Sequence, residues 1–241
     1  MRKKRKSFLQ RLSEYDGRTA EERAYAIVNH AVDFFITAVI VVALILGGYS
    51  YYISQRQLHN AGAGFTGYTM EQLGAVGWIT IDHTNIDYPV MQGKTNTEYL
   101  NKDPLGQMSV SGSIFLDSAS ASDFSDPYSV IYGHHMVQGK MFGALDSFQD
   151  FSYLKSHTTG LLKTAAKKNY NVRIFACISV SAKNQIVFDV QRKDKASIEN
   201  LIRKKAGGKM LPYDSSKRII ALSTCQDTET VNRTVVFATI G

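Results

Sequence analysis

The sequence predicts a mainly β domain, a barrel or sandwich with inserted helices, that follows one transmembrane helix. Two observations predict this fold class. About seven or eight short runs rich in β-branched and aromatic residues alternate with turn residues after position 75, a pattern too turn-rich for a parallel α/β sheet. A stretch of twenty uncharged residues precedes them, and its length matches a bilayer core of about 30 Å.

The transmembrane helix is expected over residues 34–53. Three tyrosines, Tyr49, Tyr51 and Tyr52, lie near its end, where aromatic residues mark the membrane interface. The stretch is too long, and starts too far into the chain, for a cleaved signal peptide, so we interpret it as an uncleaved anchor. Basic residues from Arg2 to Lys6 precede it, which places the N-terminus in the cytoplasm.

We therefore expect four segments: a basic cytoplasmic segment (1–33), the transmembrane helix (34–53), a stalk or helical segment (54–73) and an extracellular domain (74–241). The net charge is +7, of which residues 1–33 carry +3. This mild excess comes without a basic stripe interleaved with aromatics, which argues against nucleic acid as a partner. The sequence has two cysteines, and Cys177, inside an apolar strand, is interpreted as structural rather than disulfide-bonded.

The elements are expected in the following order. Thr19 and Glu22 match a capping box, so a first helix begins near Ala20. β-rich runs predict strands over 76–81, 86–91, 113–117, 129–134, 170–181, 185–191, 218–225 and 231–239. A second capping box predicts a short helix over 95–100, and apolar residues at spacing three predict helical turns between 141 and 154. Asp194 is expected to cap a helix over 194–205, which the glycines at 207 and 208 end.

The last two strands carry a candidate nucleophile. A polar turn joins them into a hairpin. If this turn is symmetric about Glu229, Ala221 pairs with Phe237, Ser223 with Val235 and Cys225 with Arg233, all on one face. Arginine stays protonated, so it can favour a thiolate and stabilise an oxyanion. The alternative is an inert core thiol beside a solvated arginine.

A thiol that reacts near neutral pH needs a base, and the chain has six histidines. The segment Tyr132-Gly133-His134-His135 stands out because it ends an apolar strand at a glycine, which lets another group approach closely. Adjacent residues of an extended strand point to opposite faces, so the two histidines are poor partners for one metal and we exclude a zinc site. One of them can face Cys225, and alternation leaves open which.

Tyr-Gly-His at 132–134, Leu-Ser-Thr-Cys at 222–225 and Arg233, eight residues after the cysteine, together resemble the sortases. The order of these residues and the membrane-anchored N-terminus are also similar. A helix inserted before the strand that starts near Lys217 resembles class B in particular. The resemblance covers roughly residues 74–241. It implies an eight-stranded sortase barrel, a cysteine transpeptidase, and no required metal or other cofactor.

The resemblance also implies residue roles. Cys225 is the nucleophile, His134, directly after the glycine, is the acid and base, and Arg233 holds the oxyanion and the substrate backbone. Ser223 and Thr224 are expected to offer hydroxyls to the substrate, with a purely structural place in the strand as the alternative. The helix over 194–205 is expected to form a wall of the substrate groove.

The implied substrates are surface proteins that bear a C-terminal sorting signal, cleaved after Thr, and an amine of cell-wall peptide. The anchor would sit in membrane lipid. Three alternatives stay open: a sortase that polymerises pilins through a pilin lysine, a hydrolytic cysteine peptidase, and a receptor ectodomain without enzymatic activity. The nucleophile loops of chymotrypsin-like enzymes, such as Gly-Cys-Gly-Gly, are absent from the sequence, which counts against the peptidase.

Overall fold

The computed structural model describes residues 19–63, 65, 67–192, 194–224 and 232–241. The chain divides into two compact units, Met1–Ser54 and Gln55–Gly241. Helix α2 (Ala20–Ala63) starts in the first unit and continues past its end. The predicted capping box is present at its start, where Thr19 Oγ1 accepts from the Glu22 N–H at 3.3 Å and Glu22 Oε2 accepts from the Thr19 N–H at 2.7 Å.

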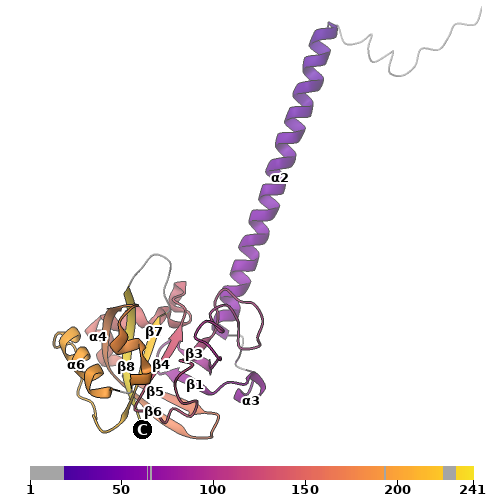
Figure 1. Ribbon diagram of the computed structural model, residues 1–241. Helices are drawn as coiled ribbons and strands as arrows, with labels where there is room; N and C mark the ends of the chain where they lie inside the picture. Colours follow the sequence, from indigo (N-terminus) through magenta and orange to yellow (C-terminus); the bar gives the residue numbers. More distant parts are fainter. Residues whose placement is uncertain (1–18, 64, 66, 193, 225–231) are drawn as a thin grey trace, which may run out of the picture. The chain divides into compact units, whose positions relative to one another are not determined.

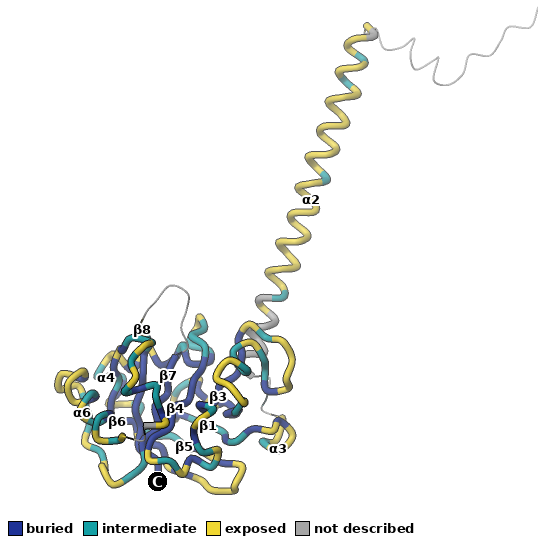
Figure 2. The backbone as a smooth tube through the Cα atoms, in the orientation of Figure 1, coloured by how far each residue is buried: buried dark blue, intermediate teal, exposed yellow. Residues whose placement is uncertain are grey.

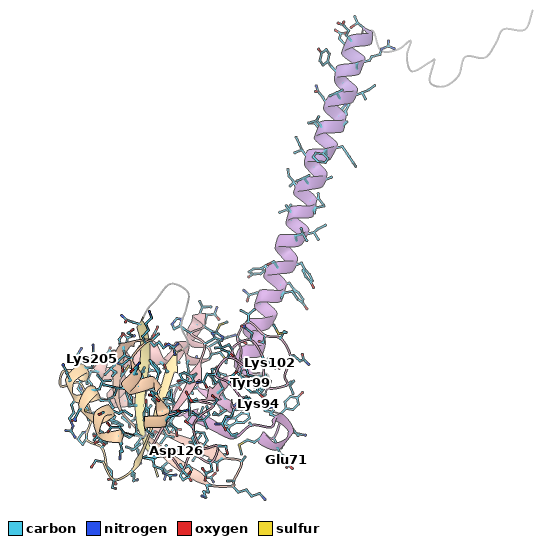
Figure 3. All side chains as sticks on the ribbon, viewed as in Figure 1. Glu71, Lys94, Tyr99, Lys102, Asp126 and Lys205 are labelled. Carbon is cyan, nitrogen blue, oxygen red and sulfur yellow. The ribbon has the colours of Figure 1, made fainter. Side chains whose placement is uncertain are left out.

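The N-terminal helix α2 is long and apolar enough, over Glu21–Ile53, to cross a membrane. None of its most apolar window is buried, and its side chains project outward from every side of the helix (Figure 3). An uncleaved anchor and a signal sequence both satisfy this criterion of length and composition. The segment after residue 53, expected as a stalk or a helix, is helical as far as Ala63, and the short helix α3 (Met70–Leu73) follows.

The second unit is a closed β-barrel, as predicted (Figure 1). Its strands are β1 (Gly77–Ile81), β2 (Asp87–Met91), β3 (Ile114–Leu116), β4 (Tyr128–Gly133), β5 (Thr159–Thr164), β6 (Asn169–Ser181), β7 (Arg218–Thr224) and β8 (Asn232–Ile240). They are neighbours in the order β1-β2-β3-β4-β7-β8-β6-β5, and β5 pairs with β1 to close the barrel. The pairs β2–β3 and β4–β7 are parallel, and the others are antiparallel.

Helices decorate the connections between the strands. They are η1 (Val137–Gly139), η2 (Phe142–Gln149), α4 (Phe151–Ser156), α5 (Gln185–Phe188), η3 (Val190–Arg192) and α6 (Lys195–Ala206). The predicted helical turns between 141 and 154 are therefore present as η2 and α4. Helix α6 begins where predicted, because the Asp194 side chain accepts from the Ser197 N–H at 3.0 Å. It ends at Gly207, whose φ of 56° suits glycine.

The barrel has apolar residues on both faces of several strands. One buried cluster takes residues from all eight strands and fills the interior. A second cluster lies on the other face of β4, β7 and β8, where Ile198 and Ile202 of α6 cover it. Alternation explains the division, since Ile220 and Leu222 belong to the first cluster and Ile219 to the second. Figure 2 accordingly shows β4 and β7 as buried.

Two of the sequence predictions for secondary structure were wrong, and one strand was missed. The run 185–191 is not a strand but α5 followed by η3, because Asn184 Oδ1 accepts from the Val187 N–H at 3.1 Å and starts a helical turn. Residues 95–100 form turns rather than a helix, since Glu98 Oε2 accepts from the Lys94 N–H at 2.9 Å instead of from the Thr95 N–H that a capping box requires. The strand β5, with its glycine at 160, was not predicted.

Candidate active site

Strand β4 brings His134 to the rim of the barrel. The strand ends at Gly133, where a Cβ atom would lie 2.3 Å from Ile114 Cδ1 and 2.8 Å from Phe142 Cγ. The close approach predicted for this glycine is therefore present. The next residue, His134, is half-buried, and its carbonyl accepts a hydrogen bond from the Phe142 N–H at 2.9 Å.

Strands β7 and β8 have the predicted register, with Ala221 opposite Phe237 and Ser223 opposite Val235. Strand β7 ends at Thr224, the residue before Cys225, and Thr224 pairs with Gly133 of β4. The ends of β4 and β7, each followed in sequence by a predicted catalytic residue, thus lie side by side. Cys225 itself, and with it the predicted pairing of Cys225 with Arg233, lies outside the described residues.

Arg233 lies near the start of β8, opposite Val180 of β6. Its guanidinium carbon is 4.8 Å from the centroid of the Phe188 ring, a distance typical of a cation–π contact. The Nε atom is buried and has no hydrogen-bond partner within the described part of the chain. Because a buried donor without a partner is costly, this N–H is well suited to a ligand that brings an acceptor oxygen.

The His134 ring is held by a backbone carbonyl. Its Nε2 atom lies 2.6 Å from Leu100 O. A carbonyl oxygen only accepts hydrogen bonds, so Nε2 must carry the proton in this contact. Nδ1 is therefore the ring atom that remains for proton exchange with a substrate.

Two of the predicted catalytic residues, His134 and Arg233, line one cavity of about 500 Å³. Its lining combines His134 and Arg233 with aromatic, aliphatic and amide side chains: Asn96, Thr97, Leu100, Asn101, Phe115, Tyr132, Ala182 and Phe188. The volume lies within the usual range of ligand pockets, about 300–1,000 Å³. The structure thus places His134 and Arg233 in one site that is large enough for a few residues of an extended peptide.

A buried carboxylate fixes one wall of this cavity. Asp117 is 3% exposed, and its Oδ2 accepts from the Tyr132 hydroxyl at 2.9 Å and from Asn96 Nδ2 at 2.8 Å. Burial raises the pKa of Tyr132, and the negative charge of Asp117 raises that pKa further. The Tyr132 hydroxyl therefore stays a protonated donor to Asp117 at physiological pH, which holds the ring in the wall.

Ser223 and Thr224, predicted to touch substrate, are both buried in β7. The Ser223 hydroxyl donates to the Thr224 carbonyl at 3.1 Å, and Thr224 Oγ1 accepts from the Thr234 N–H at 3.2 Å. Both hydroxyls thus have partners inside the protein, and neither residue lines the cavity. Their contact with substrate stays a prediction.

The helix that lines the cavity differs from the predicted one. The wall was expected from the helix over 194–205, whereas the lining comes from α5 through Phe188 and, among the described residues, from no part of α6. Phe188 was missed because its run was interpreted as a strand. Asp117 could have been found from the sequence, because it is a carboxylate that directly follows the apolar strand run Ile114–Leu116. Leu100 could not have been found in this way, because its contact with His134 is made by its backbone carbonyl rather than by its side chain.

The second cysteine lies away from this cavity. Cys177 is half-buried on β6 with a free thiol, and burial, together with the charge of Asp146, raises its pKa to about 12. Such a thiol is protonated at neutral pH, which fits the structural role predicted for it. In the ranges that the structure describes, no three His, Cys, Asp or Glu side chains gather in a way that suits a metal ion.

Comparison with known proteins gives consistent results. Residues 79–240 match the family model for the sortase domain. Sortase B of Listeria monocytogenes is 34% identical over 158 residues, which cover 64% of this chain and 63% of that protein, a little under two thirds of its length. Sortase B of Staphylococcus aureus is 31% identical over 170 residues, which cover 68% of this chain and 69% of that protein.

Solved structures agree with these relatives. A Streptococcus pyogenes class B sortase involved in pilus biogenesis is similar with a TM-score of 0.64 and 35% identity, over 73% of this chain and 99% of that one. A Staphylococcus aureus sortase B–substrate complex has a TM-score of 0.62 and 26% identity, over 81% and 96% of the two chains. The chain therefore belongs to the sortase family, and among these cysteine transpeptidases it is a class B sortase.

Proposed function

We propose that this chain cleaves a C-terminal sorting motif after Thr and joins the new acyl end to an amine, with Cys225, His134 and Arg233 as catalytic residues. One observation carries the proposal: His134 and Arg233, far apart in sequence, line the same cavity. It is supported by the end of β7 beside β4, one residue before Cys225.

In the first half-reaction the Cys225 thiolate attacks the carbonyl carbon of the substrate Thr, and the carbonyl π electrons move to the oxygen. The Arg233 Nε–H, buried without a partner among the described residues, donates to this oxyanion. When the oxyanion collapses, the C–N bond breaks and imidazolium His134 gives its Nδ1 proton to the leaving amine. The products are a thioester on Cys225 and a free amine.

In the second half-reaction an acceptor amine loses a proton to His134 and attacks the thioester carbon. The C–S bond breaks, an amide forms and the Cys225 thiolate is restored. Water competes with the amine for the same thioester, so the site must exclude water. The apolar rings of Phe115 and Phe188 in the cavity wall favour such exclusion.

The proposed substrates that are cleaved are surface proteins with a C-terminal sorting signal, and the proposed acceptor is an amine of peptidoglycan. The similarity to a Staphylococcus aureus sortase B that was solved as a substrate complex supports the proposal that the substrate binds in this cavity. We place residues 1–33 in the cytoplasm, 34–53 in the membrane lipid, 54–73 as the connecting segment and 74–241 as the catalytic domain outside the cell. The run of basic residues before the apolar helix supports this orientation.

A pilin lysine is the second candidate acceptor. The observation that favours it is the similarity, at 35% identity, to a class B sortase involved in pilus biogenesis. Peptidoglycan and pilin amines differ in their surroundings but enter the same second half-reaction. The two acceptors are therefore distinguished by competition rather than by the structure of the cavity.

The catalytic assignment is tested with the full-length chain in detergent and a library of fluorogenic sorting peptides that vary around Thr. We expect Cys225→Ala to abolish cleavage because no other thiolate reaches the carbonyl. Cys177→Ala is the matched control and should cleave normally. Cleavage by Cys225→Ala at the wild-type rate would rule out the cysteine mechanism.

The acceptor is tested in the same reaction with added cell-wall stem peptide or with a lysine-bearing pilin peptide. Amide products with the stem peptide support peptidoglycan attachment, whereas a preference for the lysine peptide supports pilin polymerisation. A carboxylate product that does not diminish when either amine is added would identify a hydrolase. The same library shows which residues before Thr the cavity selects.

A further inference from the structure

A single carboxylate on η2 connects residues next to two of the proposed catalytic residues. Asp146 Oδ2 lies 2.7 Å from His135 Nε2, and Asp146 Oδ1 accepts from the Thr234 hydroxyl at 2.8 Å. His135 directly follows His134 in the chain, and Thr234 directly follows Arg233. Asp146 therefore joins the loop after β4 to the start of β8.

The same network reaches the end of β7. The Thr234 N–H donates to Thr224 Oγ1 at 3.2 Å, and Thr224 is the residue before Cys225. Thr234 is 8% exposed and Thr224 5% exposed, so water competes little for this contact. Gln149, also on η2, donates to the Thr234 hydroxyl at 3.0 Å. Each proposed catalytic residue thus has an immediate chain neighbour in one hydrogen-bonded network.

We propose that Asp146 is a positioning residue, which sets the spacing of His134, Cys225 and Arg233 by holding His135 directly and Thr224 through Thr234. The inference rests on the catalytic assignment of the preceding section. Neighbouring residues of an extended chain point to opposite sides. In agreement, His134 and Arg233 line the cavity, whereas His135 and Thr234 do not.

The network is better suited to position than to stability. The His135 and Asp146 side chains are 35% and 46% exposed, and ion pairs at that exposure contribute little to folding. Catalysis is more sensitive, because a displacement of about 1 Å costs on the order of 10²-fold in rate. Loss of the network should therefore lower kcat while the melting temperature changes little.

The decisive pair of variants is Thr234→Val and Thr234→Ser in the full-length chain. Valine has nearly the shape of threonine and keeps the backbone N–H to Thr224, but it has no hydroxyl for Asp146. We expect Thr234→Val to lower kcat about tenfold, with KM changed by less than about twofold and an unchanged melting temperature. Thr234→Ser keeps the hydroxyl and should recover most of kcat.

Asp146→Ala is expected to lower kcat at least as much as Thr234→Val, since it releases His135 as well. Asp150→Ala is the matched control: Asp150 is an exposed carboxylate close by in the chain, and it caps α4 by accepting from the Ser152 N–H at 2.7 Å. This control should lower the melting temperature and leave kcat unchanged. Kinetics use the fluorogenic sorting peptide with amine acceptor.

Wild-type kcat in both Asp146→Ala and Thr234→Val would overturn the proposal. So would a Thr234→Ser variant as slow as Thr234→Val, because the hydroxyl would then not be the link. Cys225→Ala is measured alongside to distinguish a failure of the positioning role of Asp146 from a failure of the catalytic assignment. If it is inactive while the network variants are normal, only the positioning role fails; if it is active, the catalytic assignment fails first.

Discussion

Replacing Arg233 with lysine keeps the positive charge and removes the planar guanidinium. The Nε–H group, buried and without a partner among the described residues, is lost in this substitution. The guanidinium contact with the Phe188 ring, at 4.8 Å, is lost as well. An ammonium group is a compact point charge that cannot replace a rigid fork of donors, so the substitution tests geometry rather than charge.

The expected magnitude follows from these two losses. Removing one donor to a developing oxyanion typically costs about 10²–10³ in kcat. The cation–π contact holds the side chain in place, and such contacts are worth about 1–2 kcal/mol when partly desolvated. We therefore expect Arg233→Lys to lower kcat by about 10²–10³, because the interaction is made with the transition state.

The assay measures kcat and KM for a fluorogenic sorting peptide with and without an amine acceptor. Arg218→Lys is a matched control, because Arg218 lies at the far end of β7 with its guanidinium 4.5 Å from the Tyr170 ring. It loses the same type of contact outside the cavity and should keep wild-type kcat. A kcat of Arg233→Lys within about threefold of wild type would refute the role of the planar fork.

Three further predictions concern the site and its surroundings. Gly133→Ala should destabilise the protein by about 1–3 kcal/mol in chemical denaturation, because the added methyl overlaps two neighbouring side chains; an unchanged stability would contradict the close packing. Tyr132→Phe should cost about 1–3 kcal/mol, since it removes a donor from the buried Asp117 carboxylate, and an equally stable variant would show that this bond is dispensable. Cys177, with its pKa raised to about 12, should resist iodoacetamide at neutral pH and react faster as pH rises toward that value; mass spectrometry that finds Cys177 alkylated as fast as Cys225 at neutral pH would contradict the raised pKa.

The β7–β8 hairpin could be predicted from sequence to the level of individual residue pairs. Both of its strands are rich in β-branched residues, and the expected register followed from placing the centre of the connection at Glu229. The opposition of Ala221 with Phe237 and of Ser223 with Val235 is confirmed. The glycine before His134 could be predicted for a similar reason, because a glycine at the end of an apolar strand indicates close packing.

Other parts of the fold depend on partners that are distant in the chain. The run 185–191 has the composition of a strand, yet α5 forms there, and the Val187 carbonyl accepts from the Tyr128 hydroxyl at 2.9 Å. Thr95 and Glu98 match a capping box in sequence, but Asn96, which lies between them, bonds to Asp117, a partner in a different segment. No local pattern contains these contacts, and for the same reason the sequence did not indicate that Phe188 lines the cavity.

The topology of the barrel brings to one rim the ends of three separate strands that lie next to the proposed catalytic residues in sequence. Parallel pairing brings the C-terminal ends of β4 and β7 to the same rim. Antiparallel pairing of β7 with β8 brings the beginning of β8 to that rim as well. His134 follows the end of β4, Cys225 follows the end of β7 in sequence, and Arg233 lies at the start of β8. Strand pairing alone therefore brings the strand ends next to the proposed catalytic residues to one rim, and only the orientation of these residues depends on the loops. The hydrogen bonds of Asp146 to His135 and Thr234, which are next to His134 and Arg233 in the chain, are suited to fix that orientation.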